Sequence, residues 1–146
     1  MIIANEMNML RYGESLAVAS EPGAIIFLKG ELGAGKTTLA RGFLRGLGFE
    51  GRVKSPTYAL VESYELKSGS VFHFDLYRIQ SPRELDDMGI QDYFLSSSIL
   101  LIEWPERGEG FLPSPDVICE LAIFDNSRDV KSVAHSLRGE RMMERF

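Results

Sequence analysis

Hydrophobic residues follow two patterns along this chain, continuous runs and helical spacings, and the runs are the clearer of the two. AIIFL at 24–28 and ILLIEW at 99–104 are apolar on both faces, apart from the acid near the end of the second run. Strands covered on both sides of a parallel sheet have this composition. Pro105 ends the second run, because proline has no N–H for a central ladder. Both runs are predicted to be central strands.

Three segments show helical patterns. The first predicted helix spans residues 5–20, with Asn5 as its N-cap. The second spans 36–47, because apolar side chains recur there at helical spacing until Gly48 stops the helix. A short third helix is predicted over 81–89, where proline occupies the first helical position and a glutamate follows at N3.

The remaining apolar segments predict strands. YALVESYEL at 58–66 and SVFHFDLYRI at 70–79 form a predicted antiparallel hairpin around a Lys-Ser-Gly loop. DVICELAIF at 116–124 predicts another strand, and a weaker one follows near 130–137. Helices interleaved with apolar strands favour a three-layer α/β fold with a central, mainly parallel sheet and an antiparallel hairpin. The length and the lack of a linker predict one domain over 1–146.

The net charge of the chain limits the kinds of molecule that it is expected to bind by itself. The net charge is −5 and the pI is about 5.1. Unaided binding along a nucleic-acid backbone is therefore disfavoured, because such binding needs Lys and Arg to neutralise phosphates. Arg138, Arg141 and Arg145 form a loose basic cluster, which we interpret as a solvated helix face.

The single cysteine and the hydropathy pattern bear on the cellular compartment. Cys119 has no partner for an intramolecular disulfide, and it is predicted to pack in the core with Val117, Leu121 and Ile123. No run approaches the roughly 18 apolar residues of a membrane span. The first ten residues also lack the basic flank of a signal peptide. A cytoplasmic protein without membrane association is expected.

The most informative motif is GELGAGKT at 30–37, which matches G-x-x-x-x-G-K-[ST] between a predicted strand and a predicted helix. Glycines let the backbone approach phosphate oxygens, and successive N–H groups supply positive potential. Lys36 would reach the β- and γ-phosphates, and Thr37 would offer its hydroxyl to Mg²⁺. By chance the pattern would occur in a chain this long less than about one time in a hundred. It predicts a nucleoside triphosphate site.

Phosphoryl transfer also needs carboxylates at the ends of strands beside this loop. Glu103 ends ILLIE, where an Asp is more usual, and it would hold Mg²⁺ through water, orient the attacking water, or do both; the alternative is a solvated carboxylate. Strand alternation in VFHFDLYR places His73, Asp75 and Tyr77 on one half-exposed face. Asp75 is thus a second candidate metal ligand with His73 orienting it, unless the segment is an ordinary edge strand.

Ser55-Pro56-Thr57 lies between the second predicted helix and the hairpin. In phosphate-hydrolysing switches a threonine-bearing loop often senses the γ-phosphate. The same composition is equally typical of an ordinary loop. Both interpretations stay open.

Five motifs occur in series: GELGAGKTT, VKSPTYALVESYE, HFDLYR, the E-L-x-x-M-G of 84–89, and LIEWPER. Together they resemble the TsaE family, the small bacterial P-loop ATPases of tRNA threonylcarbamoyladenosine biosynthesis. The resemblance runs from Ala24 to Asp116 without a large gap. It implies the P-loop NTPase fold.

The resemblance also implies an activity: an ATPase that assists the TsaB–TsaD pair, which transfers threonylcarbamoyl onto adenosine 37 of tRNA. ATP hydrolysis would sustain repeated turnover of that pair, and the partners would hold the tRNA. Mg²⁺ bound with ATP would be held by Thr37 and Glu103, and Asp75 would complete the site. The residues expected to bind the phosphates are Gly33, Ala34, Gly35, Lys36, Thr37 and Thr38. Catalysis is assigned to Glu103, Asp75 and Lys36, and nucleotide sensing or partner coupling to Ser55, Thr57, His73, Tyr77, Arg78 and Trp104.

No arginine finger is evident apart from Arg78, so the isolated chain is expected to hydrolyse ATP weakly and to need the complex for activation. Three other functions stay open: a small-molecule kinase with 81–98 as its lid, a guanine-nucleotide switch, and a nucleotide-binding scaffold without turnover. The sequence predicts neither the oligomeric state nor the division of roles between Asp75 and Glu103. Asn8 and Arg128 are candidates for adenine contacts without a supporting pattern.

Overall fold

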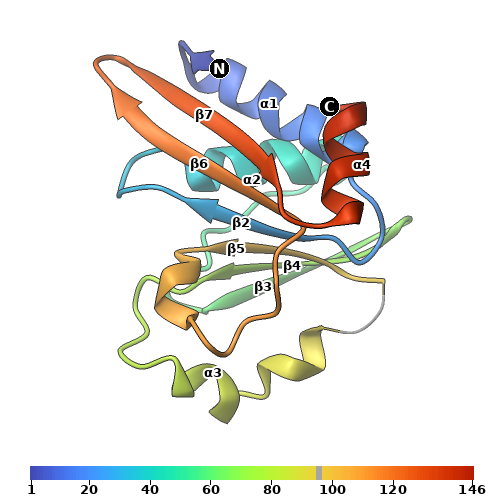
Figure 1. Ribbon diagram of the computed structural model, residues 1–146, viewed down its shortest axis with the longest axis vertical. Coiled ribbons are helices and arrows are strands. Elements are labelled where there is room, and N and C mark those ends of the chain that lie inside the picture. The colour runs from blue at the N-terminus through green and yellow to red at the C-terminus, as the bar shows by residue number, and fades with distance from the viewer. Residues whose placement is uncertain (95–96) are drawn as a thin grey trace.

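The computed structural model describes residues 1–94 and 97–146. Its strands are β1 (Ile2–Ile3), β2 (Ile25–Lys29), β3 (Val61–Leu66), β4 (Gly69–Asp75), β5 (Ile99–Glu103), β6 (Val117–Phe124) and β7 (Ser127–Ala134). Its helices are α1 (Glu6–Ala19), α2 (Lys36–Gly46), α3 (Arg83–Asp87) and α4 (Leu137–Arg145), with short 3₁₀ helices η1 (Ile90–Tyr93) and η2 (Pro105–Gly108). The strands form one seven-stranded sheet in the order β1-β7-β6-β2-β5-β4-β3 (Figure 1).

The centre of this sheet is parallel, as predicted. β2 pairs in parallel with both β5 and β6, and β4 pairs in parallel with β5. The predicted hairpin is the antiparallel pair β3–β4. The predicted strands β6 and β7 pair as a second antiparallel hairpin, and together with the short β1 they extend the sheet on its other side. The sequence pattern predicted neither this pairing nor β1.

Two hydrophobic cores, one on each face of the sheet, give the three predicted layers. Along β5 the side chain of Leu101 joins the core beneath α1 and α2, whereas Leu100 and Ile102 join the core beneath α3 and η1. Figure 1 shows α1, α2 and α4 on one side of the sheet and α3 on the other. Cys119 is fully buried in the first core, as predicted, but Ile123 is exposed because β6 continues past that core.

Helices α1 and α2 approach closely because glycines face each other at their crossing. A Cβ atom on Gly42 would collide with the backbone of Leu10, and one on Gly13 would collide with the carbonyl oxygen of Leu39. Asn5 caps α1, as predicted, since its side chain accepts from the backbone N–H of Asn8 at 2.9 Å. This packing fixes α2, and with it the loop that precedes α2, against the sheet.

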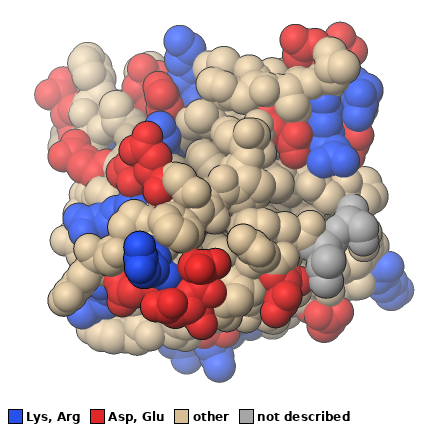
Figure 2. Space-filling model, turned by 60° about the horizontal axis from the view of Figure 1, so that its bottom comes forward, with Lys and Arg blue, Asp and Glu red and all other residues tan. Residues whose placement is uncertain are grey.

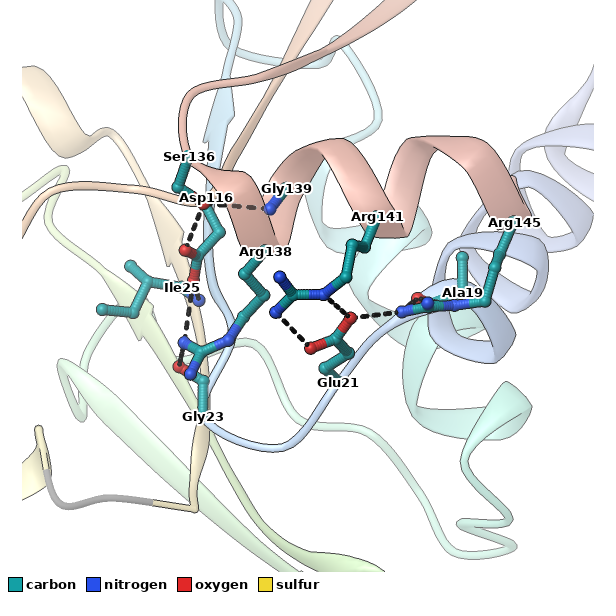
Figure 3. A network of polar contacts seen from close by, with 10 residues as sticks. All are labelled: Ala19, Glu21, Gly23, Ile25, Asp116, Ser136, Arg138, Gly139, Arg141 and Arg145. Carbon is teal, nitrogen blue, oxygen red and sulfur yellow. Dashed lines mark hydrogen bonds and ion pairs between the residues drawn. The ribbon is translucent and has the colours of Figure 1, made fainter.

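Arg141 and Arg145 of α4 are exposed, as the predicted solvated helix face requires, but the arginines of this helix also dock it on the rest of the chain. Arg141 and Arg145 both bind the carboxylate of Glu21, at 3.0 and 2.7 Å (Figure 3). Arg138 donates to the carbonyl oxygen of Gly23 at 2.9 Å and lies 3.3 Å from Asp116. The arginines therefore join α4 to the turn between α1 and β2.

No helix in the described part of the chain is long and apolar enough to cross a membrane. The candidate lid at 81–98 includes residues 95–96, which lie outside the described residues. Within its described part, Leu85 and Ile90 are buried in the core beneath α3 and η1.

Candidate functional site

The loop between β2 and α2 is shaped to hold an anion. Gly33 and Gly35 have φ of +81° and +104°, in the left-handed region that glycine adopts without a steric penalty. No side chain caps the start of α2. Its first backbone N–H groups and the positive end of the helix dipole are thus directed at the loop, which is the arrangement that binds phosphate.

Lys36, the first residue of α2, is held inside this loop. Its Nζ donates to the carbonyl oxygen of Gly30 and, at 2.9 Å, to that of Glu31. The ammonium also lies 4.3 Å from the ring centroid of Trp104. Burial lowers the pKa of Lys36, and the nearby carboxylates, first Glu103, oppose that shift.

Glu103 ends β5 next to α2, and it is buried instead of solvated. Its carboxylate oxygens accept from the hydroxyl of Thr37 at 3.2–3.3 Å. Nε2 of His73 lies 2.6 Å from Oε2 of Glu103. The pairing of β4 with β5 sets Asp75 opposite Glu103, so both acids reach the same edge of the sheet. The structure thus brings together the two carboxylates that the sequence singled out.

The interpretation of β4 as an edge strand with a half-exposed polar face is wrong. β4 lies between β3 and β5, and the side chains of His73 and Asp75 are buried. His73 Nδ1 has no hydrogen-bond partner among the described residues. The strand ends at Asp75, so Tyr77 lies beyond it in a turn. The polar face is therefore buried under α2 as part of the site.

Asp75 connects the site to the Ser55–Thr57 loop. Its Oδ2 accepts from the hydroxyl of Thr57 at 3.1 Å, and its Oδ1 accepts from the backbone N–H of Tyr77 at 3.0 Å. The hydroxyl of Ser55 lies 2.8 Å from that of Thr57. Burial is the largest cause that raises the pKa of Asp75. The loop is positioned to respond to a group bound beside this acid.

These groups surround a cavity of about 430 Å³, which we call the phosphate cavity. Its lining comprises Leu32, Gly33, Gly35, Lys36, Thr37, Thr38, Thr57, Asp75, Tyr77, Arg78, Glu103 and Trp104. Nearly all the residues predicted for the site thus line one space. Ala34 is buried, and Ser55 and His73 lie behind the lining as partners of Thr57 and Glu103.

Aromatic residues form one wall of the phosphate cavity. The rings of Tyr77 and Trp104 lie 4.9 Å apart. Trp104 has a left-handed φ of +58°, a strained conformation for a bulky residue and one that clusters at functional sites. Arg78 stacks on Tyr58 at 4.3 Å, and Arg107 stacks on Tyr77 at 5.1 Å. Sequence reasoning missed Arg107, although it lies in the quoted LIEWPER motif.

A second cavity of about 340 Å³ lies on the other side of the loop, and we call it the nucleoside cavity. Thr38, Asn126 and Arg128 are among its lining residues, and a guanidinium nitrogen of Arg128 donates to the carbonyl oxygen of Gly33 at 3.1 Å. Asn8 lines a different cavity, near the N-terminus. Of the two candidates for adenine contacts, only Arg128 is beside the loop.

The side-chain oxygens of this site suit a Mg²⁺ ion that is also bound by the phosphates of a nucleotide. Mg²⁺ takes oxygen ligands and usually binds through one or two protein groups plus phosphates and water. Thr37 and Glu103 offer such oxygens within 3.3 Å of each other, and Asp75 lines the same cavity. Among the described residues no cluster of three or more His, Cys, Asp or Glu forms a complete metal site. The protein groups therefore fit a metal shared with phosphates.

Comparison with known proteins gives one consistent family. The family model described as threonylcarbamoyl adenosine biosynthesis protein TsaE matches residues 3–133. A tRNA threonylcarbamoyladenosine biosynthesis protein TsaE of Haemophilus influenzae is 44% identical, covering 99% of this chain and 94% of that protein. Its counterpart in Bacillus subtilis is 34% identical, covering 88% and 80%. A crystal structure of Bacillus subtilis YdiB superposes with a TM-score of 0.82 at 27% identity, covering 99% of this chain and 90% of that one.

Proposed function

Because this chain belongs to the TsaE family of tRNA threonylcarbamoyladenosine biosynthesis, we propose that it binds and hydrolyses Mg·ATP to sustain turnover of a TsaB–TsaD complex. One observation carries the proposal: the P-loop, Glu103 and Asp75 line a single cavity. A buried lysine and two buried carboxylates beside an anion-binding loop are costly to maintain without a ligand that uses them.

The triphosphate occupies the phosphate cavity, with its oxygens on the backbone N–H groups of Gly33 to Thr38 and on Nζ of Lys36. The adjoining nucleoside cavity takes the ribose and base, with Arg128 at its wall. Support comes from the shared lining, because Gly33, Gly35 and Thr38 border both cavities.

We assign different roles to the two acids. Glu103 would hold Mg²⁺ together with the Thr37 hydroxyl, since these groups already face each other at 3.2–3.3 Å. The bound metal would neutralise charge on the β- and γ-phosphates. Asp75 orients the attacking water and accepts its proton, because it lines the same cavity opposite Glu103 and its carboxylate is held by Thr57 and the backbone of Tyr77. The water oxygen bonds to the γ-phosphorus as the bond to the bridging oxygen breaks, which yields ADP and phosphate.

The isolated chain should hydrolyse ATP slowly. Arg78, which lines the phosphate cavity, and Arg107, beside its aromatic wall, are stacked on aromatic rings. A stabilising arginine can be worth about 10³ to 10⁵ in rate. We therefore expect contact with TsaB–TsaD in the cytoplasm to reposition one of these arginines or to supply another. The tRNA is held by those partners.

Reconstituted tRNA modification tests the function. Purified TsaB–TsaD, threonylcarbamoyl-adenylate and unmodified tRNA are combined with or without this chain and Mg·ATP, and the modified adenosine formed per complex is counted. We expect several modifications per complex only when both are present, and about one otherwise. Equal yields with Glu103→Gln and wild-type protein would favour a nucleotide-binding scaffold over an ATPase.

A further inference from the structure

A third cavity, of about 550 Å³, lies between α2 and the loop that follows it. We call it the basic groove, and its lining comprises Arg41, Arg45, Gly51, Arg52, Val53, Lys54 and Ser55. Four of the seven lining residues are cationic, and no acidic residue is among the described residues that line it. On the face shown in Figure 2, by contrast, groups of Asp and Glu alternate with Lys and Arg.

Most of these cations are available to a ligand. Arg41 pairs with Glu6 at 3.2 Å. Arg45, Arg52 and Lys54 are exposed and form no ion pair with any residue that the structure describes. Like charges gathered in a concave surface focus the local potential and attract anions, even on a chain whose net charge is −5.

The groove suits carboxylates of a protein better than a nucleic-acid backbone. Guanidinium groups bind carboxylates through two parallel hydrogen bonds, and Arg clusters commonly recognise acidic motifs. Single-stranded nucleic acids are bound on aromatic side chains, and the described lining contains none. A long polyanion would also be repelled by the acidic chain, whereas a short acidic segment carries few charges. We propose that the basic groove binds an acidic segment of a partner protein.

Two residues of the basic groove, Ser55 and Arg41, connect it to the proposed nucleotide site. Ser55 lines the groove, and its hydroxyl lies 2.8 Å from that of Thr57, which in turn donates to Asp75 at 3.1 Å. Arg41 lines both the basic groove and the nucleoside cavity. Occupation of the groove is therefore coupled to the nucleotide state. This coupling rests on the proposed ATPase function, whereas binding of the acidic segment does not.

Binding is tested without nucleotide, so the result is independent of ATPase activity. A fluorescein-labelled hexaglutamate peptide is titrated with the full chain, and fluorescence anisotropy gives the affinity. We expect Arg45→Glu/Arg52→Glu to weaken binding by about tenfold or more, because two of the bidentate partners are replaced by like charges. The matched control is Arg83→Glu/Lys131→Glu, which makes the same change of net charge at exposed positions of α3 and β7. It should change the affinity by less than about twofold.

Three results would overturn the inference: no binding by the wild-type chain, an equal loss in the control variant, or tighter, groove-dependent binding of an oligouridine of similar length. The last result would assign the groove to RNA. For the coupling, a non-hydrolysable ATP analogue with Mg²⁺ should shift the peptide affinity in wild-type protein but not in Thr57→Val. Separate titration of that analogue distinguishes failed coupling from failed nucleotide binding.

Discussion

Nε2 of His73 on β4 lies 2.6 Å from Oε2 of Glu103 on β5. β5 in turn pairs with β2, the strand that leads into the P-loop. Both side chains are buried, and the second ring nitrogen of His73, Nδ1, has no hydrogen-bond partner among the described residues. The contact fixes the Glu103 carboxylate with both of its oxygens within 3.2–3.3 Å of the Thr37 hydroxyl. His73 thus acts through Glu103 as a positioning residue.

Replacing His73 should slow ATP hydrolysis without abolishing nucleotide binding. We expect His73→Leu to lower kcat by about 10- to 100-fold, the usual effect of removing the partner of a metal ligand. His73→Gln should recover part of this loss, because its amide can occupy the place of Nε2. A purely structural role for His73 would instead lower the thermal stability of both variants and leave the kcat of the folded fraction unchanged.

Glu103 and Asp75 should give distinguishable defects. We expect Glu103→Gln to weaken the binding of Mg²⁺, so that more Mg²⁺ is needed for half-maximal nucleotide binding. Asp75→Asn should leave the Mg²⁺ requirement unchanged and lower kcat by about 10²- to 10⁴-fold, the range of general-base catalysis. Titrations of Mg²⁺ at fixed nucleotide, followed by phosphate release, separate the two. If Asp75→Asn raised the Mg²⁺ requirement and Glu103→Gln lowered only kcat, the roles of the two acids would be reversed.

Trp104 should report nucleotide binding. It is the only tryptophan of the chain, and the ammonium of Lys36 lies 4.3 Å from its ring centroid. A triphosphate that draws Lys36 toward its oxygens removes this contact, so intrinsic fluorescence should change on addition of Mg·ATP. Lys36→Ala should lose about 10- to 150-fold in affinity, since a hydrogen bond to a charged group contributes about 1.5–3 kcal/mol. Arg11→Ala, on the exposed side of α1, is the control and should bind normally.

The ion pairs of Glu21 should contribute to stability above acid pH. Hydrogen bonds from Arg141 and then Arg145 lower the pKa of Glu21 from 4.5 to about 2. A carboxyl group with a lowered pKa in the folded state stabilises the protein fully above its unfolded pKa, and this contribution is lost as the pH falls from about 4.5 toward 2. Wild-type protein should therefore unfold at a higher temperature than Glu21→Gln at pH 7. The difference between the two should shrink over that acid range, and a constant difference would contradict the assignment.

The sequence predicted the parts of the site that follow from local rules. GELGAGKT defines a loop and a helix start by itself, and strands of a parallel sheet end at a common edge, so Glu103 was correctly linked to the P-loop. The pattern of β4 predicted the wrong environment, because alternation of polar and apolar residues cannot distinguish solvent from a buried polar site under α2. The contact between His73 and Glu103 depends on the register of β4 against β5, which only the tertiary pairing determines. For the same reason the docking of α4 on Glu21 was missed, since 120 residues separate Arg141 from its partner.

Steady-state phosphate release from Mg·ATP, measured for this chain alone and with purified TsaB–TsaD, tests the central claim most directly. The pair without this chain is the blank. Our account predicts slow release by the chain alone, strong stimulation by the pair, and loss of both in Asp75→Asn. A rate for the isolated chain on the order of 1–100 s⁻¹, as in kinases, or no stimulation while ATP is still bound, would contradict it.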